Sequence, residues 1–103
     1  MAERTHVYGE VENQSDLKRI FTEIRRDIDQ AKNREALTEL YKRAGYLIAL
    51  TQAPSWKEKF GREAGDLQRE AEEQFTTTVR AINRRARAVG TKADYDEKWG
   101  DGR

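Results

Sequence analysis

An uninterrupted apolar pattern in the second half of the chain limits the possible folds more than any other feature. Apolar residues recur there at spacings of three and four: Trp56, Phe60, Ala64, Leu67, Ala71, Phe75, Val79, Ile82, Ala86 and Val89. This spacing places all of them on one face of an α-helix. Ser55 and Glu58 match a capping box at its start, and Gly90 suits its C-terminal end. The pattern predicts one amphipathic helix over residues 56–89, about 50 Å long.

Two glycines complicate this prediction. Gly61 and Gly65 lie inside the predicted helix, and each weakens a helix by up to about 1 kcal/mol relative to alanine. Three interpretations remain open. The glycines mark a kink, a later start of the helix near Arg62, or a close contact with a neighbouring helix.

Two shorter helices are predicted before it. The first covers residues 16–32, capped by Asn13 or Ser15, and its apolar stripe is Leu17, Ile20, Phe21, Ile24, Ile28 and Ala31. The second covers residues 34–52 and has the stripe Leu37, Leu40, Tyr41, Ala44, Leu47 and Ile48. The two stripes lie on opposite faces of a continuous helix, so a turn with Asn33 capping the second helix is favoured over a single helix. Pro54 ends the second helix.

The composition agrees with a small helical protein. The 103 residues leave room for one domain, and 38% of them are charged against 36% hydrophobic, which suits helices with one buried stripe each. We therefore predict an all-α fold, either an antiparallel helical hairpin or a three-helix bundle with one long C-terminal helix. Residues 1–14 are expected to form a flexible or docked arm, and residues 91–103 an acidic, aromatic tail.

The length of the predicted long helix indicates a partner. Two helices of about 25 Å cover only part of a stripe of about 50 Å, so apolar surface would remain exposed. Homodimerisation through a coiled-coil-like antiparallel pair of long helices crossing near Phe75 would cover it and would place the acidic middle of each beside the basic end of the other. The residues predicted for this partner interface are Tyr46, Leu50, Phe75, Val79, Ile82 and Val89.

Enzymatic chemistry is not indicated by the sequence. Cysteine is absent, the single histidine is His6 in the N-terminal arm, and the glycines match neither a phosphate-binding loop nor a dinucleotide fingerprint. Acidic residues lie on predicted helix faces with lysine and arginine three or four residues away, as in solvated ion-pair networks. We expect no catalytic site, no metal site and no cofactor.

Two further features have a functional and a structural interpretation each. A cluster of basic residues at the end of the long helix either contacts nucleic-acid phosphates or complements the helix dipole: Arg80, Arg84, Arg85, Arg87 and Lys92. Tyr95 and Trp99 in the acidic tail either dock onto a protein partner or fold back onto their own bundle.

The sequence therefore predicts a non-enzymatic interaction or scaffold protein, which self-associates or serves as a small subunit of a larger assembly. The alternative is a nucleic-acid-binding accessory protein that uses the basic face of residues 80–92. Because the sequence has neither an apolar run of membrane-spanning length nor a signal-peptide core, we expect a cytoplasmic protein without membrane contact.

Overall fold

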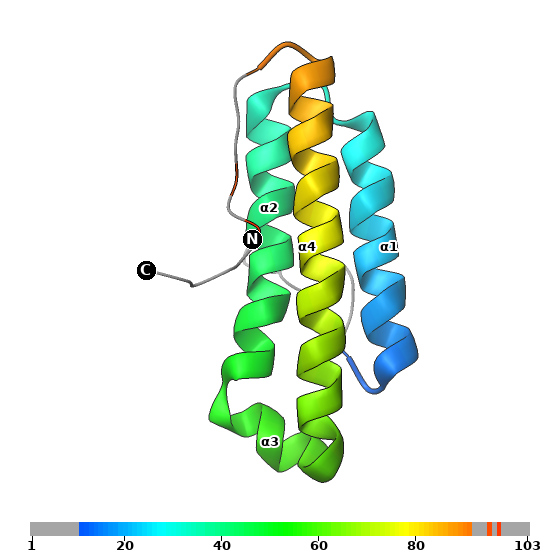
Figure 1. Cartoon of the computed structure of the whole chain (residues 1–103), viewed down its shortest axis with the longest axis vertical. Helices are drawn as coiled ribbons and strands as arrows, with labels where there is room; N and C mark the ends of the chain where they lie inside the picture. The colour runs from blue at the N-terminus through cyan, green and yellow to red at the C-terminus, as the bar shows by residue number, and fades with distance from the viewer. Residues whose placement is uncertain (1–10, 92–94, 96, 98–103) are drawn as a thin grey trace, which may run out of the picture.

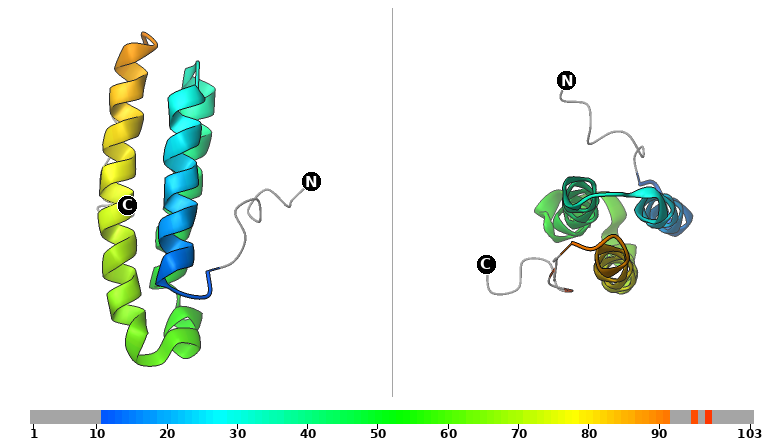
Figure 2. Two further views of the ribbon diagram at one scale, coloured as in Figure 1. Left: turned by 90° about the vertical axis from the view of Figure 1, so that its right-hand side faces the viewer. Right: turned by 90° about the horizontal axis from the view of Figure 1, so that it is seen from above.

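The computed structural model of the chain describes residues 11–91, 95 and 97, and three long helices pack together in it (Figure 1). Its elements are α1 (Gln14–Gln30), α2 (Arg34–Gln52), α3 (Pro54–Phe60), the 3-10 turn η2 (Gly61–Glu63) and α4 (Ala64–Ala88). Helices α1 and α4 run in one direction and α2 in the other, and α4 contacts both of its neighbours (Figure 2). The prediction of an all-α fold is confirmed.

The turn between the first two helices lies between Gln30 and Arg34, where the apolar stripe changes to the opposite helix face. The Asn33 side chain caps α2 by accepting a hydrogen bond from the Ala36 N–H at 2.8 Å. Asn13 caps α1 in the same way, through the Asp16 N–H at 2.9 Å. The choice of two helices over one is thus confirmed. Opposed stripes can face one core only if the chain reverses between them.

The prediction of one helix over residues 56–89 is wrong. The chain leaves α-helical geometry after Phe60, and Gly61 has a positive φ of 57°. Helix α4 starts at Ala64 and is about 37 Å long instead of about 50 Å. In Figure 1 the separate helix α3 lies across the base of the bundle.

The proposed capping box is also wrong. Helix α3 starts at Pro54, with Ala53 as its N-cap and with no side-chain cap. Proline suits the first helical position because its missing N–H would have no intrahelical partner there. Ser55 therefore lies inside the helix. The C-terminal signal is confirmed, since Gly90 has a φ of 78° and the Thr91 N–H returns to the Ala86 carbonyl at 2.9 Å.

Helix α3 is held against the start of α4 by its aromatic residues. Trp56 is buried, and its Nε1 donates to the Ala64 carbonyl at 3.3 Å. Its ring centroid lies 4.4 Å from that of Phe60. The first two residues of the predicted stripe thus turn back onto their own bundle. This removes the length mismatch that indicated a partner.

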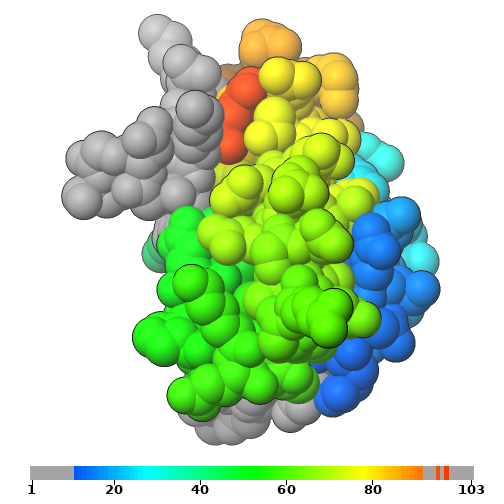
Figure 3. All heavy atoms as spheres, turned by 60° about the horizontal axis from the view of Figure 1, so that its bottom comes forward, coloured from blue at the N-terminus to red at the C-terminus, as the bar shows by residue number. Residues whose placement is uncertain are grey.

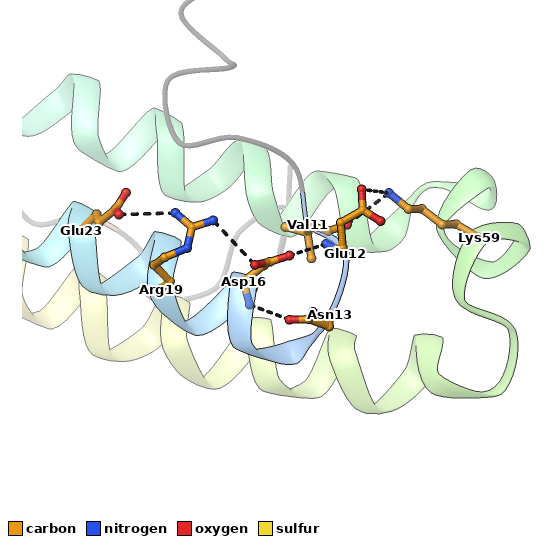
Figure 4. Close-up of polar contacts among 7 residues, drawn as sticks. All are labelled: Val11, Glu12, Asn13, Asp16, Arg19, Glu23 and Lys59. Carbon is orange, nitrogen blue, oxygen red and sulfur yellow. Dashed lines mark hydrogen bonds and ion pairs between the residues drawn. The ribbon is translucent and has the colours of Figure 1, made fainter.

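The segment before α1 is docked at the same end of the molecule (Figure 4). Val11 is buried, and its carbonyl accepts from Nζ of Lys59 in α3 at 3.1 Å. The same ammonium lies 3.7 Å from the Glu12 carboxylate, and the Glu12 N–H donates to Asp16 at 2.8 Å. Residues 11–13 are therefore part of the folded domain; the rest of the predicted arm, residues 1–10, lies outside the described residues.

Helix α1 is aligned with α4 by polar contacts as well as by the core. Arg25 donates from Nη1 to Gln74 Oε1 at 2.8 Å and to Oγ1 of the buried Thr78 at 3.2 Å. At the end of α1, Nε of Arg85 donates to the carbonyl of the cap residue Ala31 at 2.9 Å. Directional bonds at two levels restrict sliding between the helices, which apolar packing alone restricts less.

Alanine substitutions at the two glycines distinguish the broken helix from a continuous one. Gly61→Ala is expected to lower the free energy of unfolding by about 1–3 kcal/mol, because an L side chain is strained at this φ and ψ. Gly65 lies inside α4 with open space around it, so Gly65→Ala is expected to raise that free energy by about 0.5–1 kcal/mol. Urea denaturation followed by circular dichroism measures both. Stabilisation by both substitutions would contradict the break at η2.

Candidate interaction surfaces

Tyr95 of the C-terminal tail is bound to the side of the bundle through its backbone. Its N–H donates to Asn83 Oδ1 at 2.9 Å, and its carbonyl accepts from Asn83 Nδ2 at 3.1 Å. One side-chain amide thus pairs with both backbone groups of a single residue. This contact involves only the backbone of Tyr95 and does not depend on its side chain.

The Tyr95 ring adds a contact that does depend on the side chain. It stacks on Tyr41 of α2, with the centroids 4.5 Å apart and the planes inclined by 26°. Its hydroxyl shares a hydrogen bond with the hydroxyl of Thr38, one helical turn before Tyr41. The ring of Tyr41 in turn lies 5.9 Å from that of Phe75 in the core. Tyr95 therefore covers the seam between α2 and α4.

Glu97 continues the contact along α4. Its carboxylate lies 3.2 Å from Nε of Arg80, and its carbonyl accepts from Oγ1 of Thr76 at 3.4 Å. Tyr95 contacts Asn83, and Glu97 contacts Thr76 and Arg80 earlier in α4, so the order of these two described residues is antiparallel to the helix. Figure 3 shows the described tail residues, in red, beside the second half of α4, in yellow. We call the surface formed by Thr38, Tyr41, Thr76, Arg80 and Asn83 the Tyr95 site.

The structure thus supports the fold-back interpretation for Tyr95. Trp99, the other residue of the predicted docking tail, lies outside the described residues. The sequence did not indicate Asn83 or Thr38 as tail-binding residues. An asparagine and a threonine on helices have no pattern that distinguishes a backbone-binding role from a solvated one.

The basic cluster divides between two faces of α4, because Arg85 lies away from Arg80, Arg84 and Arg87. Arg80 is paired with Glu97, and Arg85 is half-buried where it caps the end of α1. Arg85 lies about 140° around α4 from Arg80 on a helical projection. Arg84 and Arg87 are exposed, and Lys92 lies outside the described residues. Arg80 is exposed as well, so three arginines of the predicted nucleic-acid face, within about 60° of one another on α4, remain at the surface.

Three of the predicted partner-interface residues are core residues of the chain itself. The exposed fractions of Phe75, Val79 and Ile82 are 1%, 0% and 0%, so the prediction that they face a partner is wrong. The cause is the break at η2, because the shorter α4 is covered by α1 and α2. A coiled-coil crossing at Phe75 is excluded for the same reason. Val89 is half-buried and packs against the core.

The outer face of α2 retains the accessible part of the predicted interface. Tyr46 has an exposed fraction of 41%, and Ala49 is also exposed. Leu50 and Ala53 are half-buried beside them. These four residues form a short apolar surface, which we call the α2 strip. Three of its residues, Tyr46, Ala49 and Leu50, belong to residues 44–50, which contain no charged or strongly polar side chain apart from the Tyr46 hydroxyl.

The other surfaces of the described residues give weaker indications of a binding site. An open pocket of about 370 Å³ lies where α1 turns into α2, and it is lined by Asp27, Gln30, Ala31, Ala36, Glu39, Leu40 and Arg43. In the described part of the chain no three side chains of the types that bind metals are grouped as ligands would be. His6 lies outside that part. None of the described helices is both long and apolar enough to cross a membrane.

Comparisons with known proteins identified no similar protein. No protein-family model matches the chain, and neither a curated protein nor a solved structure matches it significantly. Its class is therefore given by its own geometry: a small all-α protein with a tail residue docked on its side.

Proposed function

We propose that this chain is a non-enzymatic, cytoplasmic interaction or scaffold protein that self-associates through the α2 strip, alone or as a small subunit of a larger assembly. The observation that supports this most directly is Tyr46, a large aromatic side chain with 41% of its surface exposed on a strongly charged protein. Tyrosine is enriched in interfaces because its ring is apolar and its hydroxyl tolerates water. Exposed aromatic anchors of this kind often dominate binding energy.

A second copy of the chain is a suitable partner for this strip. A two-fold axis beside Tyr46 would place the strip against its own equivalent, as in most homodimers. In an antiparallel α2–α2 contact, Leu50 of each copy would pack on the aliphatic part of Lys42 of the other. The strip has four residues, far fewer than the roughly 20–30 per partner of a stable complex. We therefore expect a weak dimer.

Sedimentation velocity over a range of concentrations tests the proposal. The wild-type chain is expected to pass from monomer to dimer between about 10 μM and about 1 mM. Tyr46→Glu is expected to weaken association at least tenfold, because it buries a carboxylate against an apolar surface. Thr77→Glu is the matched control, since Thr77 is exposed on α4 and the substitution adds the same charge. A wild-type chain that stays monomeric, or equal effects of the two substitutions, would contradict self-association through α2.

Nucleic-acid binding remains the second candidate because Arg84 and Arg87 are both exposed near the end of α4. They lie within about 60° of each other on the helix, so both can face one phosphate backbone. The purified sample used for sedimentation also addresses this candidate. Copurifying nucleic acid that is lost from an Arg84→Gln, Arg87→Gln variant would favour it over self-association.

A further inference from the structure

We propose that the Tyr95 site binds an extended acidic segment of a partner protein, in which a tyrosine is followed two residues later by a carboxylate, and that the chain's own tail occupies this site in the structure described here. The site lies on the seam of α2 and α4 and shares no residue with the α2 strip. The proposal therefore goes beyond self-association and does not depend on it.

The contacts at the site divide into general and selective ones. Asn83 pairs with the N–H and the carbonyl of one residue, so it can hold any extended segment. Selection comes from stacking on Tyr41 and from the hydroxyl of Thr38, which together fit a phenol. Arg80 then selects a carboxylate two residues further along. A backbone anchor combined with spaced side-chain contacts is how extended peptides are commonly recognised.

The charge around the site agrees with an acidic ligand. Arg80 and Arg87 lie within about 20° of each other on α4, and Asn83 lies on the same side of the helix. The chain has no acidic residue between Arg80 and Lys92, whereas the tail contains Asp94, Asp96 and Glu97. One of these basic residues, Arg80, already contacts an acidic residue of the tail, Glu97.

The short connection explains why the tail occupies the site and why a partner can displace it. Six residues, 89–94, join the end of α4 to Tyr95, so the tail is held near the site at an effective concentration on the order of millimolar. At this effective concentration, a few weak contacts are enough to keep the tail bound to the site. The tail of a second copy has the same contacts without this advantage and cannot compete at ordinary concentrations. A partner segment that makes additional contacts with the bundle can displace the tail.

Fluorescence anisotropy with a labelled synthetic peptide of the tail sequence, residues 92–99, tests the site in full-length protein. Tyr95→Ala removes the ring that occupies the site without changing the site itself. This variant is expected to bind the peptide at least about tenfold more tightly than the wild-type chain does, because the competing tail is weakened. Adding Asn83→Ala to it is expected to reverse that gain, and a peptide with alanine in place of its tyrosine should bind at least about tenfold more weakly.

The controls separate this site from the α2 strip and from loss of the fold. Glu97→Lys breaks the ion pair and leaves the ring in place, so it should give a smaller gain in peptide affinity than Tyr95→Ala. Tyr46→Ala should leave peptide binding unchanged, whatever sedimentation shows. Equal peptide affinity of the wild-type and Tyr95→Ala chains, or a gain that survives Asn83→Ala, would overturn the proposal. Loss of a wild-type dimer on Tyr95→Ala would also overturn it, since the site would then bind the tail of a second copy.

Discussion

Phe75→Ala is expected to lower the free energy of unfolding by about 3–5 kcal/mol. Only 1% of the Phe75 surface is exposed, and the ring packs against Tyr41 of α2 with a centroid distance of 5.9 Å. Truncation removes the buried ring and leaves a cavity between α2 and α4 that the helices cannot fully close. A loss of this size is a large part of the stability of a domain of about 100 residues.

Urea denaturation followed by circular dichroism measures this effect at several protein concentrations. Phe75→Leu is a milder variant, expected to cost less than about 1.5 kcal/mol, and keeps the test informative if Phe75→Ala does not fold. Tyr46→Ala is the surface control and should change the free energy of unfolding by less than about 0.5 kcal/mol. If Phe75→Ala kept the stability of the wild-type monomer and weakened only a dimer, Phe75 would be an interface residue after all.

Trp56→Ala is expected to lower the free energy of unfolding by about 3 kcal/mol, the second largest effect. Trp56 is 6% exposed at the base of the bundle, where its Nε1 donates to Ala64 at the start of α4. Its removal would also uncover Phe60, whose ring packs against it with the planes inclined by 49°. Without this aromatic pair, little else would hold α3 across the end of the bundle.

Trp56→Phe separates the contribution of the buried ring from that of the hydrogen bond to Ala64. Phenylalanine keeps an aromatic ring in the site but cannot donate to the Ala64 carbonyl, so we expect a loss of about 1 kcal/mol. Thermal unfolding followed by circular dichroism compares the three chains. A loss below about 0.5 kcal/mol for Trp56→Ala would mean that Trp56 is exposed at the end of a continuous helix, and the fold-back of α3 would be wrong.

Local signals in the sequence predict much of the helical structure. Asn13 and Asn33 cap helices because their short side chains reach the first free N–H groups. Gly90 ends α4 because its positive φ carries no steric penalty. Each of these preferences acts within a few residues, so a pattern in the sequence indicates it directly.

The candidate sites depend on contacts that local patterns do not contain. Arg80 and Arg85 are similar basic residues in the sequence, yet one pairs with the tail and the other caps α1. Tyr95 is twelve residues from Asn83 and more than fifty from Thr38, and it contacts both. Only the packed helices bring these side chains within hydrogen-bonding distance.

By itself the sequence determined the all-α class, the turn at Asn33, the end of α4 and the apolar faces of the helices. That the apolar pattern of residues 56–89 belongs to two helices follows from the packing of the whole chain. A spacing of three and four continues through the break because α3 and α4 both turn apolar residues toward one core. A continuous helix would keep the backbone hydrogen bonds at Gly61, whereas the bent chain buries Trp56. Which of the two conformations has the lower free energy depends on packing against residues distant in the sequence. That balance left α4 short enough for the chain to cover and moved the accessible surface to Tyr46 and the Tyr95 site.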